Sequence, residues 1–263
     1  MKLVIIGGGI MGEALLAAAL RQHVVEPQDV TVCEVAEHRR LQLRSEYDVE
    51  VTDACEGPMR QADAVVIAVK PQDIPGVRGS LRDDALLISI AAGVPMRRLA
   101  THFEHRRIVR VMPNTPAAAG AGMSVWTCSD DVTAEQRAFV AKLLAALGRE
   151  LFVSDERKID MATAVSGSGP AYVFLFAEAL IEGAVGIGLP RNQAEELVWQ
   201  TILGAAVYAQ KAGKSAADLR AMVTSPAGTT AAGLLAMERA AFRAAVIDAV
   251  RAAYQRALEL GEG

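Results

Sequence analysis

The stretch that decides the fold runs from Lys2 to Gly12 and reads KLVIIGGGIMG. Its first part, Lys2 to Ile6, is apolar and rich in β-branched residues, which is typical of a buried strand. Three glycines follow at once, and the residues from Glu13 to Leu20 have the composition of a helix. A strand, a glycine turn and a helix in this order satisfy the G-x-G-x-x-G pattern of a dinucleotide-binding unit.

The glycines of this turn predict a site for a pyrophosphate. Gly7 allows a tight turn, Gly9 lets the backbone approach the phosphates, and Gly12 lets helix and strand pack closely. The amides at the start of the helix then face the phosphates. An ordinary tight turn is the alternative, and the position between an apolar strand and a helix disfavours it.

The alternation of strands and helices continues to residue 154 and then stops. Strands alternating with helices predict a parallel sheet covered on both faces. The expected strands are Lys2–Ile6, Val30–Val35, Val49–Val51, Ala64–Ala68, Ala85–Ser89, Ile108–Met112, Gly122–Cys128 and Glu150–Val153. We therefore predict an α/β chain with a Rossmann-type dinucleotide-binding domain over residues 1–154 and an all-helical domain over residues 155–263.

The helical part is rich in alanine and leucine. Its long helices are expected over Pro170–Val185, Asn192–Lys211 and Phe242–Leu260. The first is apolar nearly all round, which predicts a buried helix. So much apolar surface in about a hundred residues predicts burial against a second subunit.

The composition indicates a soluble globular protein. Of the 263 residues 52% are hydrophobic and 22% charged, so the chain is long enough to bury a core without disulfides or a structural metal. The formal net charge of -4 disfavours nucleic acid, which favours a basic surface. The four histidines, which show no metal or carboxylate pattern, are expected at the surface: His23, His38, His102 and His105.

Cysteine usage and hydropathy favour the cytoplasm. The cysteines have neither paired nor metal-ligand spacing and are expected to be free thiols: Cys33, Cys55 and Cys128. The first strand leaves no room for a signal peptide before it. The longest apolar run, Pro170 to Leu189, carries Glu178 and Glu182, which argues against a membrane span.

The end of the second strand bears on the choice of coenzyme. Glu34 stands 22 residues beyond Gly12, where an acidic residue accepts from a ribose 2′-hydroxyl and repels a 2′-phosphate. This favours NADH. Arg39 and Arg40 follow closely and can reach a phosphate instead, so NADPH stays open, as does a plain solvated charge at the strand end.

Three further turns fall at carboxyl ends of strands, where open α/β sheets bind their ligands. They are Ala68-Val69-Lys70-Pro71, Ser89-Ile90-Ala91-Ala92-Gly93 and Met112-Pro113-Asn114-Thr115-Pro116. Small residues there let backbone amides approach a coenzyme. Asn114 is a candidate contact for the nicotinamide or its ribose, although Asn is also a good turn former.

The helical part contains neither His nor Cys, so it offers no obvious base for an alcohol. A protonated imine can accept hydride without a strong acid nearby. Two polar loops, Ser166–Pro170 and Thr224–Thr230, each lead into a helix, and such helix starts can hold a carboxylate. Two well-capped helices are the plainer interpretation.

At these residues the sequence resembles the pyrroline-5-carboxylate reductase family. The signature-like stretch LRAMVTSPAGTTAAGLLAME spans Leu219 to Glu238. The Ala-Val-Lys-Pro turn, the Met-Pro-Asn-Thr-Pro loop and Val165–Tyr172 also match in order and approximate spacing. The resemblance covers almost the whole chain.

The resemblance implies hydride transfer from NADPH or NADH to the C=N bond of Δ1-pyrroline-5-carboxylate, giving L-proline in the last step of proline biosynthesis. It implies a homodimer, or a higher oligomer of dimers, formed by the helical domain. Thr230 would donate to the ring nitrogen, and Ser225 with the amides of Gly228 and Thr229 would hold the carboxylate. Glu156 falls where a carboxylate lies near the substrate. Coenzyme contacts would fall on Gly7, Gly8, Gly9, Ile10, Met11, Gly12, Glu34, Cys55, Ala68, Val69, Lys70, Pro71, Ala91, Ala92 and Asn114.

Two positions depart from the family pattern. Cys55 stands where relatives often have Asn near the adenosine, and Glu34 replaces a residue that would favour a 2′-phosphate. Two other functions remain as alternatives. A β-hydroxyacid dehydrogenase would need Lys and Asn where Val173 and Ala177 stand. A non-catalytic dinucleotide sensor would have no need of intact polar loops in the helical part.

Overall fold

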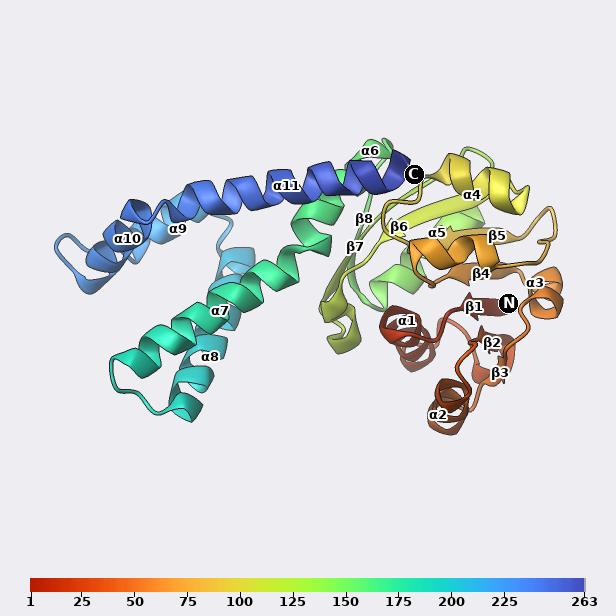
Figure 1. Cartoon of the computed structure of the whole chain (residues 1–263), viewed down its shortest axis with the longest axis horizontal. Coiled ribbons are helices and arrows are strands. Elements are labelled where there is room, and N and C mark those ends of the chain that lie inside the picture. Colours follow the sequence, from red (N-terminus) through yellow and green to blue (C-terminus); the bar gives the residue numbers. More distant parts are fainter. Residues whose placement is uncertain (263) are drawn as a thin grey trace. The chain divides into compact units, whose positions relative to one another are not determined.

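The computed structural model describes residues 1–262, and their arrangement is drawn in Figure 1. The chain forms two compact units. The first holds residues 1–168 together with the end of α11 (Phe242–Glu262) from Ala253 onward. The second is Gly169–Ala252.

The first unit is built on one eight-stranded sheet. Its strands are β1 (Leu3–Ile6), β2 (Val30–Cys33), β3 (Glu50–Thr52), β4 (Ala64–Ile67), β5 (Leu86–Ser89), β6 (Ile108–Met112), β7 (Gly122–Cys128) and β8 (Gly148–Phe152). The order is β3-β2-β1-β4-β5-β6-β7-β8, and each neighbouring pair is parallel except β6 with β7. The chain runs outward from β1 to β2 and β3 and then returns to β4. This reversal places a ligand crevice at the carboxyl ends of β1 and β4.

Helices and short turns connect the strands, and α6 and η4 follow the last strand. They are α1 (Ile10–Arg21), α2 (Glu37–Tyr47), α3 (Glu56–Gln61), α4 (Met96–Phe103), α5 (Ala134–Ala145), α6 (Arg157–Ala162), the 3₁₀ turns η1 (Pro27–Asp29), η2 (Pro71–Gly76) and η3 (Thr115–Ala119), and the π-helical turn η4 (Thr163–Gly167). Helix α5 begins at a capping box in which Thr133 and Gln136 satisfy each other's backbone amides. The predicted α/β organisation is therefore confirmed.

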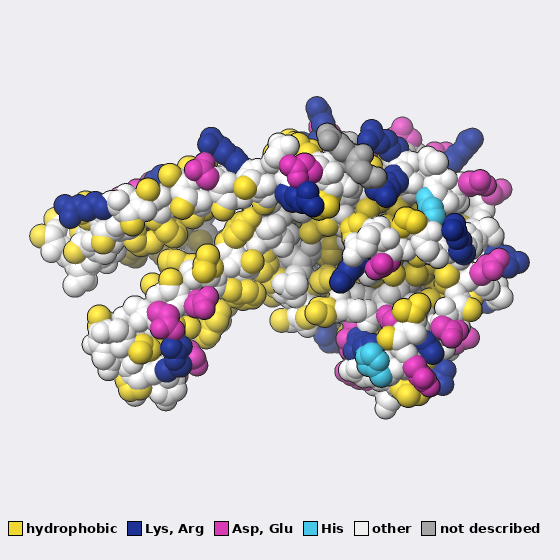
Figure 2. Space-filling view, viewed as in Figure 1, with side chains coloured by type: hydrophobic (Ala, Val, Ile, Leu, Met, Phe, Trp, Pro, Cys, Tyr) yellow, Lys and Arg dark blue, Asp and Glu magenta, His cyan; other side chains and the backbone are white. Residues whose placement is uncertain are grey.

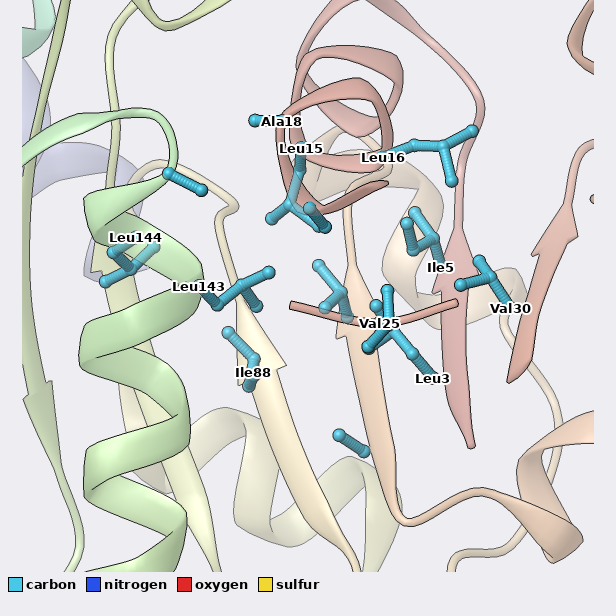
Figure 3. Packing of buried hydrophobic residues seen from close by; sticks show 14 of the residues in the cluster. Leu3, Ile5, Leu15, Leu16, Ala18, Val25, Val30, Ile88, Leu143 and Leu144 are labelled. Atoms are coloured by element: carbon cyan, nitrogen blue, oxygen red, sulfur yellow. The ribbon is translucent and has the colours of Figure 1, made fainter. Parts of the chain in front are cut away.

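The core of this unit lies on both faces of the sheet, because successive side chains of a strand point to opposite faces. Leu3 and Ile5 join a cluster with Leu15 of α1, which Figure 3 shows from close by. Val4 and Ile6 join a second cluster on the other face. A continuous apolar run in β1 is thus explained by burial on both sides.

The second unit consists of helices. They are α7 (Gly169–Gly186), α8 (Arg191–Ala212), α9 (Ala216–Met222), α10 (Thr229–Arg239) and the first part of α11. Helices α7 and α8 pack through four buried residues: Ala177, Ile181, Ala194 and Val198. Ser215 begins α9 by accepting from the amide of Asp218.

The prediction that the helix over Pro170–Val185 is buried is wrong for a single chain. Leu175 of α7 is 67% exposed and Phe174 is 54% exposed. Figure 2 shows hydrophobic side chains spread over the surface of α7 to α11. The continuous helix Arg157–Gly186 is long and apolar enough to cross a membrane, and 17% of its most apolar 18-residue segment is buried. One layer of neighbouring helices covers only one side of an apolar helix, which leaves the rest uncovered.

The change from strands to helices falls between Phe152 and Arg157, where the sequence pattern changes. The compact units divide later, after Ser168. Helix α6 belongs to the first unit because Arg110 of β6 pairs with Glu156 and Asp160. These ion pairs join α6 to the sheet, and no hydropathy pattern reveals them.

The histidines differ from the prediction at one position. His23 and His38 are exposed, as expected, and His102 is half-buried. His105, in contrast, is buried, with its Nε2 2.8 Å from the carbonyl oxygen of Ala85. A single backbone partner satisfies the ring nitrogen and allows burial without a metal or carboxylate.

Candidate active site

The glycine turn after β1 has the shape that the sequence pattern predicts. Gly7 has φ +104°, a left-handed conformation that side chains rarely adopt. A Cβ on Gly12 would lie 2.0 Å from the carbonyl oxygen of Gly7, so no side chain fits there. Glycine is therefore required at position 7 by the backbone conformation and at position 12 by the close packing of α1 on the turn after β1.

Gly9 differs, because a Cβ built on it meets no atom within 4 Å. It caps the start of α1, and the next residue, Ile10, is 74% exposed. The protein itself therefore does not require glycine at this position. An open backbone at a helix start fits the pyrophosphate of a dinucleotide, whose phosphates need that space.

Glu34, the expected ribose ligand, is held by backbone amides. One carboxylate oxygen accepts from the amide of Gly8 at 2.8 Å, and the other accepts from the amide of Ala36 at 2.8 Å. The carboxylate thus joins the end of β2 to the glycine turn. Each oxygen keeps a further lone pair, so acceptance from a ribose hydroxyl stays compatible with these contacts.

The two arginines that follow have protein partners. Arg39 donates to the carbonyl of Gly8 at 2.6 Å and pairs with Glu13 at 2.7 Å. Arg40 donates to the carbonyls of Glu34 and Val35, each at 2.8 Å. Both guanidinium groups therefore already have acceptors within the chain.

Sequence reasoning missed the Glu13 side of this network. Tyr47 at the end of α2 donates to Glu13 at 3.2 Å. Burial, together with the charge of Glu13, raises the pKa of Tyr47 above its ordinary value. The hydroxyl thus stays protonated and helps to fix α2 against α1.

The cysteines of this unit are free thiols, as predicted. Cys55 stands at the start of α3 and its Sγ donates to the carbonyl of Arg78 at 3.2 Å. Burial raises the pKa of Cys33 to about 12. A thiol protonated at neutral pH has little nucleophilic reactivity, so Cys33 acts as a core residue.

The turns after β4 and β5 lie on the same edge of the sheet as the glycine turn. Ala68 follows β4, and Val69, Lys70 and Pro71 lead into η2. After β5 the buried hydroxyl of Ser89 accepts from the amide of Ala91 at 3.3 Å, next to Ala92. The predicted coenzyme residues of the three turns are thus brought to one sheet edge, because all three strands are parallel.

Asn114 has both functional atoms engaged. Its Nδ2 donates to the carbonyl of Ser166 at 3.0 Å, and its Oδ1 accepts from the amide of Met123 at 2.8 Å. It joins the loop after β6 to the π-helical turn η4. A contact of its side chain with a nicotinamide would have to share these atoms.

The expected loop Ser166–Pro170 is not a loop. Ser166 and Gly167 belong to η4, and the chain is helical from α6 through α7. Ser166 Oγ donates to the carbonyl of Ala162 at 3.1 Å, which is a local alternative that Ser offers the helix. A Cβ on Gly167 would lie 2.6 Å from Cε of Met112, so the glycine reflects packing on β6. Such π-helical turns occur frequently at functional sites.

The second loop, in contrast, has the predicted form. Helix α10 starts at Thr229, with Gly228 as its cap and no side-chain cap. A Cβ on Gly228 would meet Oγ of Ser225, so this hydroxyl lies close to the backbone of the helix cap. The loop leaves Ser225, Thr229 and Thr230 exposed within the second unit. First-turn amides of such a helix have no partner inside the helix and form an anion site.

Glu156, expected near the substrate, has partners within the first unit. Its Oε1 accepts from the amide of Met96 at 2.7 Å and from Arg110 at 3.1 Å. The side chain is 30% exposed, whereas Arg110 is 3% exposed. Through these contacts Glu156 joins the start of α4 to Arg110 of β6.

Comparison with known proteins covers the chain from end to end. The family model described as "Pyrroline-5-carboxylate reductase dimerisation" matches residues 156–260, and the one described as "NADP oxidoreductase coenzyme F420-dependent" matches residues 2–93. A pyrroline-5-carboxylate reductase of Synechocystis is 42% identical, with 100% of this chain and 99% of that protein covered. The chain belongs to the pyrroline-5-carboxylate reductase family. A pyrroline-5-carboxylate reductase of Arabidopsis thaliana is 38% identical over 99% of this chain and 96% of that protein.

Solved structures of pyrroline-5-carboxylate reductases have the same fold. The enzyme from Streptococcus pyogenes matches with TM-score 0.90 and 30% identity over 98% of both chains. The Plasmodium falciparum pyrroline carboxylate reductase, solved with NADP bound, matches with TM-score 0.88 and 30% identity over 99% of this chain and 98% of that chain. The family resemblance inferred from the loops is confirmed, and so is the use of a nicotinamide coenzyme.

Proposed function

We propose that this protein reduces Δ1-pyrroline-5-carboxylate to L-proline with NAD(P)H, as the last step of proline biosynthesis. The observation that carries the proposal is the full-length match to proteins named pyrroline-5-carboxylate reductase. The open backbone at Gly9 supports it, because this is where a dinucleotide needs room. The β-hydroxyacid alternative fails on Ala177, which is buried in the packing of α7 on α8.

The reaction does not require a strong general acid from the protein. When bound, the reduced nicotinamide supplies a hydride to the imine carbon of the ring, which becomes C5 of proline. A protonated ring nitrogen takes the electron pair of the C=N bond and becomes the amine of proline. The chain then has two tasks, which are to hold the carboxylate and to aim the ring.

The loop before α10 is suited to the carboxylate. The amides at the start of α10 carry the positive end of the helix dipole, and Ser225 adds a hydroxyl donor. We assign the carboxylate to Ser225 and the amides of Gly228 and Thr229. Thr230, one residue further, is assigned to the ring nitrogen.

The coenzyme is assigned to the sheet edge of the first unit. Its pyrophosphate lies at residues 7–12, and its further contacts fall on Cys55, on residues 68–71, on Ala91 and Ala92, and on Asn114. The charge of Glu34 favours NADH over NADPH, because the carboxylate repels a 2′-phosphate. The engagement of Arg39 by Glu13 supports the same preference.

The exposed apolar side chains of the second unit are assigned to a homodimer contact, with larger assemblies built from dimers. Leu175, Leu203 and Trp199 are exposed in one chain, and residues 156–260 match a dimerisation domain. Contiguous apolar surface of this kind marks an interface. The same assignment covers the apolar helix Arg157–Gly186 and supports a cytoplasmic enzyme.

The decisive experiment measures oxidation of NADH and of NADPH by the purified protein with and without Δ1-pyrroline-5-carboxylate. We expect oxidation that depends on the imine, with NADH the better coenzyme by kcat/KM. Coenzyme binding without imine-dependent turnover would instead indicate a dinucleotide sensor.

A further inference from the structure

The turn between β5 and α4 is supported by two segments distant in the sequence. It comprises residues 90–95 and carries Ala91 and Ala92, which are assigned to the coenzyme. One support comes from α6, which precedes the second unit in the chain. The other comes from the end of α11, which follows it.

Helix α4 cannot cap its own start. Its cap residue is Pro95, which makes no side-chain hydrogen bond, and the first turn contains no acidic residue. Arg97 and Arg98 instead place positive charge at the positive end of the helix dipole. The amide of Met96 donates to Glu156 at 2.7 Å, so the carboxylate of the residue just before α6 supplies the missing cap.

Glu156 is itself held by a buried cation. Arg110 projects from β6 and is 3% exposed at its side chain, and its Nη1 donates to Glu156 at 3.1 Å. Its Nη2 pairs with Asp160, one turn further along α6. Asp160 therefore shares the guanidinium with Glu156, whereas Glu156 also accepts from the amide of Met96.

The end of α11 covers the same turn at Gly93. This glycine is buried and has φ +70°, and a Cβ built on it would lie 2.5 Å from Cβ of Leu260. A Cβ on Gly261 would in turn lie 3.5 Å from the carbonyl oxygen of Gly93. The last turn of α11 thus lies directly on the backbone of the coenzyme turn.

We propose that Glu156 and Leu260 are positioning residues that hold the β5–α4 turn in its coenzyme-binding conformation. The inference rests on the proposed function only in that the turn contacts the coenzyme. If the turn is already ordered before the coenzyme binds, coenzyme binding does not have to offset the conformational entropy lost on ordering the turn. Loss of either support therefore weakens coenzyme binding and leaves the imine site, which lies in the second unit, unchanged.

The first test compares Glu156→Ala with Asp160→Ala in the full-length protein. Both variants remove one carboxylate from Arg110, so both lower the melting temperature. Only Glu156→Ala removes the acceptor of the Met96 amide. We expect its Kd for NADH and NADPH, measured by nicotinamide fluorescence, to rise about tenfold, as for a lost charged hydrogen bond, with Asp160→Ala within about twofold of wild type.

Conservative replacement adds a second readout. Glu156→Gln keeps an acceptor oxygen for Met96 and should recover part of the lost affinity. Equal losses of coenzyme affinity in Glu156→Ala and Asp160→Ala would overturn the proposal, because they would indicate general destabilisation.

The second test compares Leu260→Gly with Glu259→Gly. Both place glycine in the last turn of α11, and Glu259→Gly also removes an exposed ion pair with Arg256, so it costs the helix at least as much. Of these two residues, Leu260 alone lies against Gly93. We expect Leu260→Gly alone to raise the coenzyme Kd, by about threefold to tenfold. Unchanged affinity in both Leu260→Gly and Glu156→Ala, in an enzyme that turns over the imine, would refute the positioning role and leave the proposed function standing. Wild-type protein that binds coenzyme without turnover would refute the function, and the affinity comparison would still decide the positioning role.

Discussion

The two compact units of this chain differ in how far they bury their apolar side chains. In the first unit, neighbouring residues of β1 enter separate cores, so Ile5 and Ile6 are 0% and 4% exposed. In the second unit, Leu175 and Leu203 are 67% and 58% exposed although their helices are long and regular. A sheet covered by helices on both faces completes its own core, whereas a single layer of apolar helices does not. The first unit should therefore depend on its coenzyme for function, and the second on a partner subunit for stability.

The largest expected effect would remove the function of the first unit without disturbing its core. Gly9→Val places branched atoms where the pyrophosphate approaches, in space that the protein leaves open. We expect a folded protein whose Kd for the coenzyme, measured by fluorescence titration, rises above about 1 mM. This Kd corresponds to a binding free energy of about −4 kcal/mol. Gly12→Val is the contrasting variant, since its Cβ would meet the carbonyl of Gly7 and should prevent folding. A folded Gly9→Val protein with normal affinity would show that the pyrophosphate lies elsewhere.

The next effect tests the dependence of the second unit on a partner. Leu203→Glu puts a carboxylate on the exposed apolar surface of α8, and burying it unpaired costs several kcal/mol. We expect dimer association, measured by light scattering across a dilution series, to weaken by about 100-fold or more. Leu41→Glu on α2 is the matched control, because Leu41 is 59% exposed and lies in the first unit. A wild-type protein that is monomeric and stable at micromolar concentration would contradict the comparison itself.

A smaller effect sharpens the chemical role of the second unit. Thr230→Ala removes one neutral hydrogen bond, which is worth about 0.5–1.5 kcal/mol, or several-fold to about tenfold in kcat/KM. If Thr230 also polarises the ring nitrogen in the transition state, the loss reaches roughly 100-fold. Thr229→Ala keeps the backbone amide that is assigned to the carboxylate and should stay near wild type. An unchanged rate in Thr230→Ala would remove this residue from the site, and complete loss with coenzyme binding intact would show that a general acid is needed.

The smallest effect concerns coenzyme choice in the first unit. Glu34→Ser removes the charge and the acceptor of the Gly8 amide together, so affinity for both coenzymes should fall. The ratio of kcat/KM for NADPH over NADH should still rise several-fold, because repulsion of the 2′-phosphate is lost. Glu34→Gln keeps an acceptor oxygen and should shift the ratio with less loss of affinity. A ratio that does not move in either variant would show that Glu34 does not select the coenzyme.

The sequence predicted the elements of both units well. Apolar, β-branched runs between glycines and helical stretches located all eight strands to within about two residues. The helices of the second unit were equally clear from their alanine-rich runs and glycine ends. The prediction of the Ser166–Pro170 loop failed, because small polar residues also fit a π-helical turn when Met112 lies against Gly167.

The residues of the candidate site were predictable where the backbone geometry requires a particular residue type, such as glycine. Gly7 and Gly12 are needed for local geometry, so both are visible as a motif. The sequence also singled out Glu34 and Asn114, but their contacts with Gly8 and Ser166 depend on where distant turns meet. The exposed threonines of the α10 loop were singled out through the family resemblance.

What the sequence by itself determined is therefore local: the period of each strand and helix, the glycine turns, and the absence of a histidine base from the helical part. Only the tertiary structure decided that Arg110 joins α6 to the sheet and that Glu156 caps α4. It also decided that the end of α11 lies on Gly93, and that α7 stays uncovered in one chain. Local patterns follow from the chemistry of neighbouring residues, whereas these contacts join residues 46 or more positions apart, whose meeting depends on how whole elements pack.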